Sequence, residues 1–84
     1  MANEDEDYDP MVYDVMCELA THLGGIYISR ARAAATPEDE ARWRQADRDL
    51  MEEVDAVPPM ELDAVNSMTT TLRERLKAAN ESAP

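Results

Sequence analysis

The chain has 84 residues and a formal net charge of −11, with 19 acidic side chains against eight Lys and Arg. A chain of this length forms a single domain and buries only about 60 to 65% of its unfolded surface. The charge disfavours nonspecific binding to nucleic acid or to anionic membrane and favours cationic partners. A single cysteine, Cys17, excludes an intramolecular disulfide framework. It fits a reducing compartment, so we expect a cytoplasmic protein.

The first eight residues, 1–8, contain four consecutive acids and few side chains that a core could bury. This composition predicts a disordered N-terminal arm. No basic stretch and no long apolar run follow it, so we expect neither a signal peptide nor a membrane span.

A first helix is expected over about residues 10–34, with Asp9 as its N-cap and Pro10 in its first turn. Two apolar stripes with the alternating spacing of a buried helix face run along it. The first stripe is Val12, Met16, Leu19, Leu23 and Ile26, and the second is Tyr13, Cys17, Ala20, Gly24, Tyr27 and Ala31. Such wide apolar coverage predicts a helix that contacts both neighbours, or one that also contacts a second copy of the chain.

Gly24-Gly25 interrupts this helix, and each glycine costs a helix interior roughly 1 kcal/mol relative to alanine. One interpretation is a kink or break that divides the segment into two shorter helices. The other is a close approach by a neighbouring backbone at Gly24, where a Trp or Tyr ring could fit. Because the stripes keep their register past the pair, we favour a continuous or mildly kinked helix to about Ala34.

A second helix is expected over residues 37–57, because Thr36 supplies a hydroxyl cap and Pro37 and two acids follow it. Its side chains at four-residue spacing predict the ion pairs Glu38–Arg42 and Glu40–Arg44. Pro58-Pro59 ends it. Its expected buried side is Trp43, which would be a packing anchor, with Ala46, Leu50, Val54 and Val57.

A third helix is expected over residues 59–80, followed by a frayed tail at 81–84. Its apolar stripe is Leu62, Val65, Met68 or Thr69, Leu72, Leu76 and Ala79. The connections are too short for parallel neighbours. Residues 9–80 therefore predict one all-α domain, a small antiparallel up-down-up three-helix bundle.

In this topology the start of the first helix, the end of the second and the start of the third share one end of the bundle, which we call the acidic pole. Eleven carboxylates fall there, with no Lys or Arg among them: Glu4, Asp5, Glu6, Asp7, Asp9, Asp14, Glu52, Glu53, Asp55, Glu61 and Asp63. The opposite pole mixes acids with Arg30, Arg32, Arg42, Arg44, Arg73, Arg75 and Lys77.

Glu52, Glu53 and Asp55 are the carboxylates of this pole that local structure does not explain. Acids at a helix start are favoured by the helix dipole, whereas these three lie at a helix end, where each costs a few tenths to about 1 kcal/mol. A local rule broken without a structural gain indicates a binding site. The alternative is that they are solvated surface charges of an acidic protein.

The sequence therefore predicts a non-enzymatic interaction module that binds a basic protein surface through its acidic pole. A groove built to hold nucleic acid is one such surface, because carboxylates can stand in for phosphates. Tyr8 and Tyr13 are added to the predicted contacts because aromatic side chains are enriched at interfaces. The predicted partner-binding residues are Asp5, Asp7, Tyr8, Asp9, Tyr13, Asp14, Glu52, Glu53, Asp55, Glu61 and Asp63.

In composition and size the chain resembles the small acidic proteins with which phages and other mobile elements inhibit host nucleases and defence systems, and it resembles some bacterial antitoxins. The likeness implies an inhibitor that mimics nucleic acid and assigns no residue roles. The alternative function is a self-associating structural or assembly subunit, or an antitoxin-like regulator. A homodimer would then form through Tyr13, Cys17, Ala20, Gly24 and Tyr27.

No motif in the chain predicts a cofactor, a metal site, catalysis or direct contact with nucleic acid. The acids at positions 5, 7 and 9 have the spacing of a calcium loop. However, Pro10 replaces the required glycine and Met16 the closing glutamate. His22 is the only histidine, and we expect it to form a surface hydrogen bond with Glu18. Exposed acids on a convex bundle do not provide the partly dry site that acid-base catalysis needs.

Overall fold

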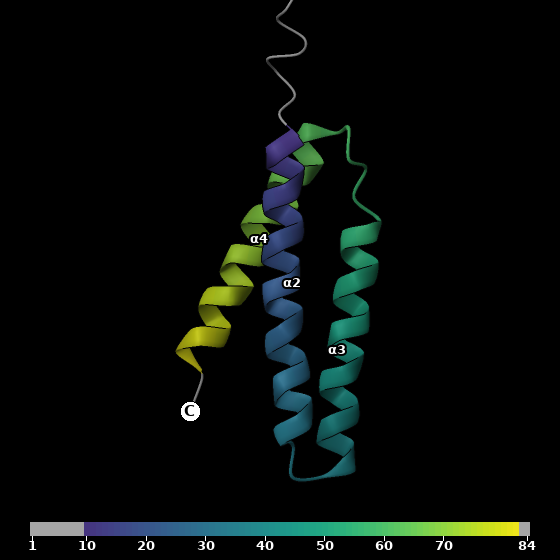
Figure 1. Ribbon diagram of the computed structural model, residues 1–84, viewed down its shortest axis with the longest axis vertical. Helices are drawn as coiled ribbons and strands as arrows, with labels where there is room; N and C mark the ends of the chain where they lie inside the picture. Colours follow the sequence, from purple (N-terminus) through teal and green to yellow (C-terminus); the bar gives the residue numbers. More distant parts are fainter. Residues whose placement is uncertain (1–9, 83–84) are drawn as a thin grey trace, which may run out of the picture.

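The computed structural model describes residues 10–82, which form three α-helices. Helix α2 spans Pro10–Ala33, α3 spans Pro37–Asp55 and α4 spans Leu62–Glu81. Consecutive helices run in opposite directions (Figure 1), and no strand occurs within residues 10–82. The predicted all-α up-down-up three-helix bundle is confirmed. The predicted arm, the Asp9 cap and residues 83–84 lie outside the described residues.

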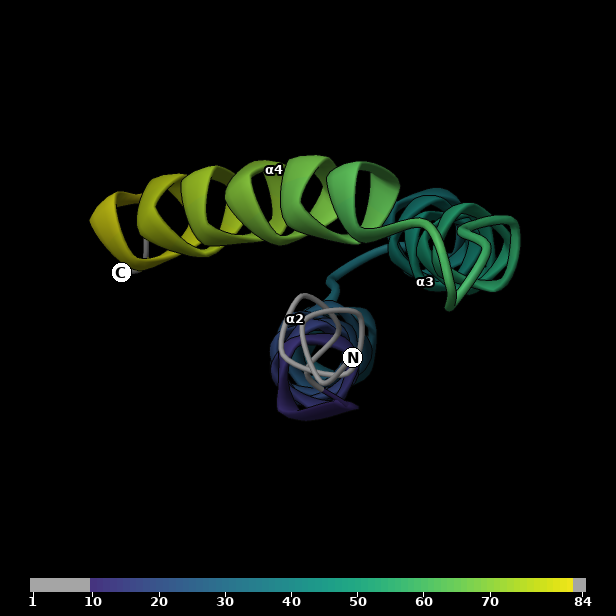
Figure 2. The same cartoon turned by 90° about the horizontal axis from the view of Figure 1, so that it is seen from above.

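Helix α2 contacts both other helices, which lie on the same half of it in Figure 2, with α4 running across it and α3 to one side. Its contacts with both neighbours are extensive, whereas α3 and α4 have no comparable contact with each other. The prediction that the first helix contacts both neighbours is therefore confirmed. Met16 and Leu23 of α2 are fully buried in the core cluster. The core cluster also contains Leu50, Val54, Val57, Val65, Leu72 and Ala79.

Helix α2 runs without a break through Gly24-Gly25, and neither glycine has a positive φ. Gly24 is buried against α3, where a Cβ would lie 2.9 Å from Asp47 Oδ1 and 3.8 Å from Leu50 Cδ2. Gly24 is thus approached by the side chains of Asp47 and Leu50, and the alternative of a neighbouring backbone or a Trp or Tyr ring at this position is wrong. A Cβ on Gly25 would meet no atom within 4 Å.

We expect Gly25→Ala to raise the free energy of unfolding by about 0.5 to 1 kcal/mol, because it removes a helix-interior glycine at a position with open space. Gly24→Ala should gain less, because its methyl group must displace the Asp47 carboxylate. Urea unfolding of the two variants measures the difference. An equal gain in both would show that Asp47 does not restrict Gly24.

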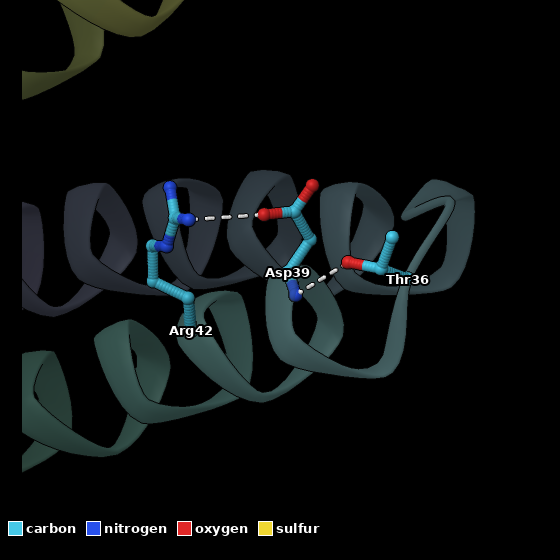
Figure 3. Close-up of polar contacts among 3 residues, drawn as sticks. All are labelled: Thr36, Asp39 and Arg42. Carbon is cyan, nitrogen blue, oxygen red and sulfur yellow. Dashed lines mark hydrogen bonds and ion pairs between the residues drawn. The ribbon is translucent and has the colours of Figure 1, made fainter.

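Helix α3 begins with the predicted cap. The Asp39 backbone N–H donates to Thr36 Oγ1 at 3.1 Å, and Pro37 is the first helical residue (Figure 3). Arg42 pairs with Asp39 at 3.0 Å, three residues away, and the predicted Glu38–Arg42 pair does not form. Arg44 pairs with Glu40 at 2.9 Å, as expected.

Thr36→Ala should lower the free energy of unfolding by about 1 kcal/mol, because the substitution leaves the Asp39 N–H without its acceptor. Thermal unfolding monitored by circular dichroism measures the loss. Thr36→Ser keeps the hydroxyl group and serves as the control, which should retain most of the stability. An unchanged stability in Thr36→Ala would contradict the role assigned to the cap.

The connection between α3 and α4 differs from the predicted boundaries. Helix α3 ends at Asp55, two residues before the predicted end, because Pro58 disfavours helical geometry at the preceding residue, Val57. The Val57 side chain turns into the core and is 8% exposed. The Glu61 N–H then donates to the Pro58 carbonyl at 3.1 Å, so a turn occupies the residues that were expected to open the third helix. Helix α4 consequently begins at Leu62.

The apolar stripe of α4 packs as predicted along most of its length. Val65, Leu72 and Ala79 are buried, and Leu76 packs against the core cluster. The choice left open between Met68 and Thr69 has no single answer, because Met68 packs against the core and Thr69 is also half-buried.

Candidate functional site

The start of α2, the end of α3 and the start of α4 lie at the same end of the molecule (Figure 1). This arrangement brings six of the predicted carboxylates to the acidic pole within residues 10–82. All of them are exposed except Glu53, which is half-buried. The six are Asp14, Glu52, Glu53, Asp55, Glu61 and Asp63. The other predicted residues of this pole, Glu4, Asp5, Glu6, Asp7, Tyr8 and Asp9, lie outside the described residues.

Glu53 has a structural partner that the sequence did not predict. Its carboxylate lies 2.9 Å from Nη1 of Arg75 on α4, and the two side chains are 41% and 37% exposed. Arg75 was expected at the opposite pole, so the prediction of no basic side chain among these acids is wrong for Glu53. The pair joins α3 to α4, two helices that share few other contacts. The ion pair therefore explains why an acid occupies position 53 near the end of α3.

Glu52 and Asp55 remain as acids at a helix end with no such explanation. Both are exposed, both lie in the last turns of α3, and neither forms an ion pair with a Lys, Arg or His between residues 10 and 82. Asp63 lies in the first turn of α4, where the helix dipole favours it. Glu61 occupies the N-cap position of α4, but its side chain makes no capping hydrogen bond.

We expect Glu52→Gln to raise the free energy of unfolding by a few tenths of a kcal/mol, because it removes an acid from a helix C-terminus. Glu53→Gln should instead leave stability unchanged or lower it by up to about 1 kcal/mol, because it also removes the ion pair with Arg75. Urea unfolding at low salt measures both variants. If the two changed stability alike, the pair with Arg75 would contribute nothing.

The second apolar stripe of α2 lies largely against α3 and the core. Gly24 is buried, while Tyr13, Cys17, Ala20 and Tyr27 are half-buried and packed against the core cluster. The residues predicted for self-association therefore make contacts within the chain. Only their outer edge remains at the surface.

That outer edge forms one wall of an open groove between α2 and α3, which sequence reasoning missed. The groove has a volume of about 650 Å³ and a mostly apolar surface. Residues from α2 include Cys17, Ala20 and Ile28, and α3 supplies Asp47, Met51 and Val54. Met51 is 58% exposed. Met51, a large apolar residue among the charged residues of the second helix, was the only sequence signal of this groove.

The opposite pole contains a contact that involves all three helices. Arg30 of α2 donates from Nη2 to the carbonyl oxygen of Ala79 at the end of α4, at 2.8 Å. The same guanidinium lies 5.1 Å from the ring centroid of Trp43 on α3, and this ring packs at 5.8 Å on Tyr27. Trp43 was expected to be a packing anchor on the buried side of its helix, but it is only half-buried and lies outside the core cluster, where it packs on Tyr27. The role of Arg30 was not predicted.

Neither a metal-binding cluster nor a membrane-spanning helix is found between residues 10 and 82. No three His, Cys, Asp or Glu side chains converge there as metal ligands, and no helix is long and apolar enough to cross a membrane. His22 is exposed, and the hydrogen bonds of this region include none between His22 and Glu18. The residues with calcium-loop spacing lie outside the described part of the chain.

Comparison of the chain with protein-family models, with curated proteins and with solved structures finds no match. The function is therefore inferred from the charge and shape of the chain itself.

Proposed function

We propose that the protein is a non-enzymatic interaction module that binds a basic protein surface through its acidic pole. The observation that supports this most directly is the pair of exposed acids Glu52 and Asp55. They end α3 at the same pole as the two acids at the start of α4, Glu61 and Asp63 (Figure 1), and within residues 10–82 the one arginine paired with an acid of this group, Arg75, is engaged by Glu53.

The charges of Glu52 and Asp55 reduce the stability of their own helix. Acids at a helix C-terminus face the negative end of the helix dipole, and like charges nearby repel them. A basic partner would reverse both effects at once, because its Lys and Arg side chains would neutralise the carboxylates. Electrostatic attraction of this kind accelerates association and weakens as salt concentration rises.

The partner class that best fits this chemistry is a protein with a basic groove for nucleic acid. The exposed carboxylates of α3 and α4 would occupy positions that phosphates otherwise take, and the bound module would block the groove. The protein would then act as an inhibitor of the nucleic-acid-mimic type, such as phages use against host defence. The net charge of −11 and the small helical fold support this proposal.

Self-association is the second candidate function, and the apolar groove between α2 and α3 favours it. A thin core and an exposed apolar surface are common in chains that become stable only as oligomers. The protein would then be an assembly subunit or an antitoxin-like regulator. Sedimentation over a range of concentrations distinguishes the two functions, since a monomer throughout the range excludes this one.

The direct test is capture of partners by the immobilised full-length protein from a bacterial lysate, at low and at high salt. The double variant Glu52→Gln/Asp55→Asn should lose the basic proteins that the unchanged protein retains at low salt. Its fold should remain intact, because both side chains are exposed and unpaired with any base between residues 10 and 82.

The matched control is Glu74→Gln/Glu81→Gln, which changes the net charge equally but alters two exposed acids further along α4. We expect this control to retain the same proteins as the unchanged chain. Equal losses in both double variants would show that net charge alone attracts the partners. Recovery of only the chain itself would favour self-association instead.

A further inference from the structure

The groove between α2 and α3 is an apolar surface that nothing in the described chain covers. The α2 side of the groove projects little into it, because Ala20 has a small side chain and Gly24 and Gly25 have none. Met51 and Ile28 provide larger apolar surface. A Cβ on Gly25 would meet no atom within 4 Å, so no packing contact within residues 10–82 requires a glycine at this position. A missing side chain at an open position permits close approach by another backbone.

The dimensions of the groove suit a single helix. Its α2 wall runs from Cys17 to Arg32, which corresponds to about 22 Å at 1.5 Å per residue. Four turns of a helix would fill this length. An amphipathic helix binds such a groove by inserting apolar residues spaced at three and four positions along one face. Methionine is common on surfaces of this kind because its flexible side chain adapts to the residues inserted.

The charges along the groove decide which kind of helix fits. The carboxylate of Asp47 lies in the α3 wall. Asp14 and Asp55 extend the two walls by one turn toward the acidic pole, since they precede Cys17 by three residues and follow Met51 by four. Arg32 is the one base in the lining, and it lies at the far end. The lining itself carries one acid and one base, so the two acids beyond its end and the net charge of −11 are what favour a positively charged occupant.

We propose that the α2–α3 groove binds a basic amphipathic helix of the partner, with its Lys and Arg side chains directed toward Asp14, Asp47 and Asp55. This inference rests on the proposed function and extends it, because it adds an apolar contact to an interaction that the acidic pole makes through charge. Such a contact provides affinity that persists at high salt, where exposed ion pairs are screened. A second copy of the chain fits less well, because it brings a further net charge of −11 to the same surface.

The probe for this proposal is a synthetic peptide of about 18 residues, made of Leu and Lys with the leucines on one helical face. A scrambled peptide of identical composition, with no apolar face, controls for charge. We expect the amphipathic peptide to bind the full-length protein at least tenfold more tightly, measured by calorimetry at moderate salt. Cys17 lines the groove and is the only cysteine, so the bound peptide should also slow its alkylation by iodoacetamide.

The variant that tests the groove is Met51→Gln, which removes an exposed apolar side chain without changing charge. It should weaken binding of the amphipathic peptide roughly fivefold to tenfold, as loss of an apolar anchor does. Met60→Gln is the matched control, because Met60 is 73% exposed and does not line the groove. Its affinity should stay within about twofold of the unchanged protein, which is the range expected for a neutral surface site.

The groove proposal is overturned if both peptides bind alike, if Met51→Gln and Met60→Gln behave alike, or if Cys17 stays equally reactive when the amphipathic peptide is bound. If both peptides bind equally well and Glu52→Gln/Asp55→Asn weakens the binding of both, the acidic pole is supported as the binding site and the groove is excluded. If neither peptide binds at low salt, the proposed function fails as well. Protection of Cys17 that rises with protein concentration alone would identify a second copy as the occupant and overturn the proposal.

Discussion

The structure depends on the burial of α2 against both other helices. Helix α3 and helix α4 each pack extensively on α2 and have no comparable contact with each other. Met16 and Leu23 are fully buried in a core cluster that also includes side chains of α3 and α4. A continuous α2 is therefore required, and this explains why the helix continues through two adjacent glycines at a local cost of roughly 1 kcal/mol each. Packing of Asp47 against Gly24 partly offsets this cost at that position.

Two arginines compensate for the missing contact between α3 and α4. Arg30 lies over Trp43 of α3 and donates to the Ala79 carbonyl of α4, so one α2 side chain joins both partners near one end. Arg75 joins α4 directly to Glu53 of α3. Both contacts are only partly buried, and an exposed ion pair such as Glu53–Arg75 contributes at most about 1 kcal/mol. They link the two outer helices, whose orientation on α2 is set by side-chain packing.

The same arrangement gives the surface two properties that act together in the proposed function. Helix direction brings the end of α3 and the starts of α2 and α4 to one pole, which concentrates exposed acids there. Packing of α3 on one side of α2 leaves an apolar groove that extends toward this pole. Charge would attract and orient a basic partner, and the apolar groove would hold a helix of that partner in place. These are separate physical terms, so separate substitutions can remove each one.

The sequence by itself determined the helices, their order and the charged ends. Periodic apolar stripes, the Thr36-Pro37 start and the Pro58-Pro59 stop are local signals, because they depend on helix geometry and on the fixed φ of proline. The tertiary structure alone decided which side chains meet between the helices. Periodicity did not show that Asp47 and Leu50 approach Gly24, that Arg75 crosses to Glu53, that Arg30 contacts both outer helices, or that a groove opens beside Met51. Each of these depends on the crossing of two helices, which is set by how all their side chains interlock.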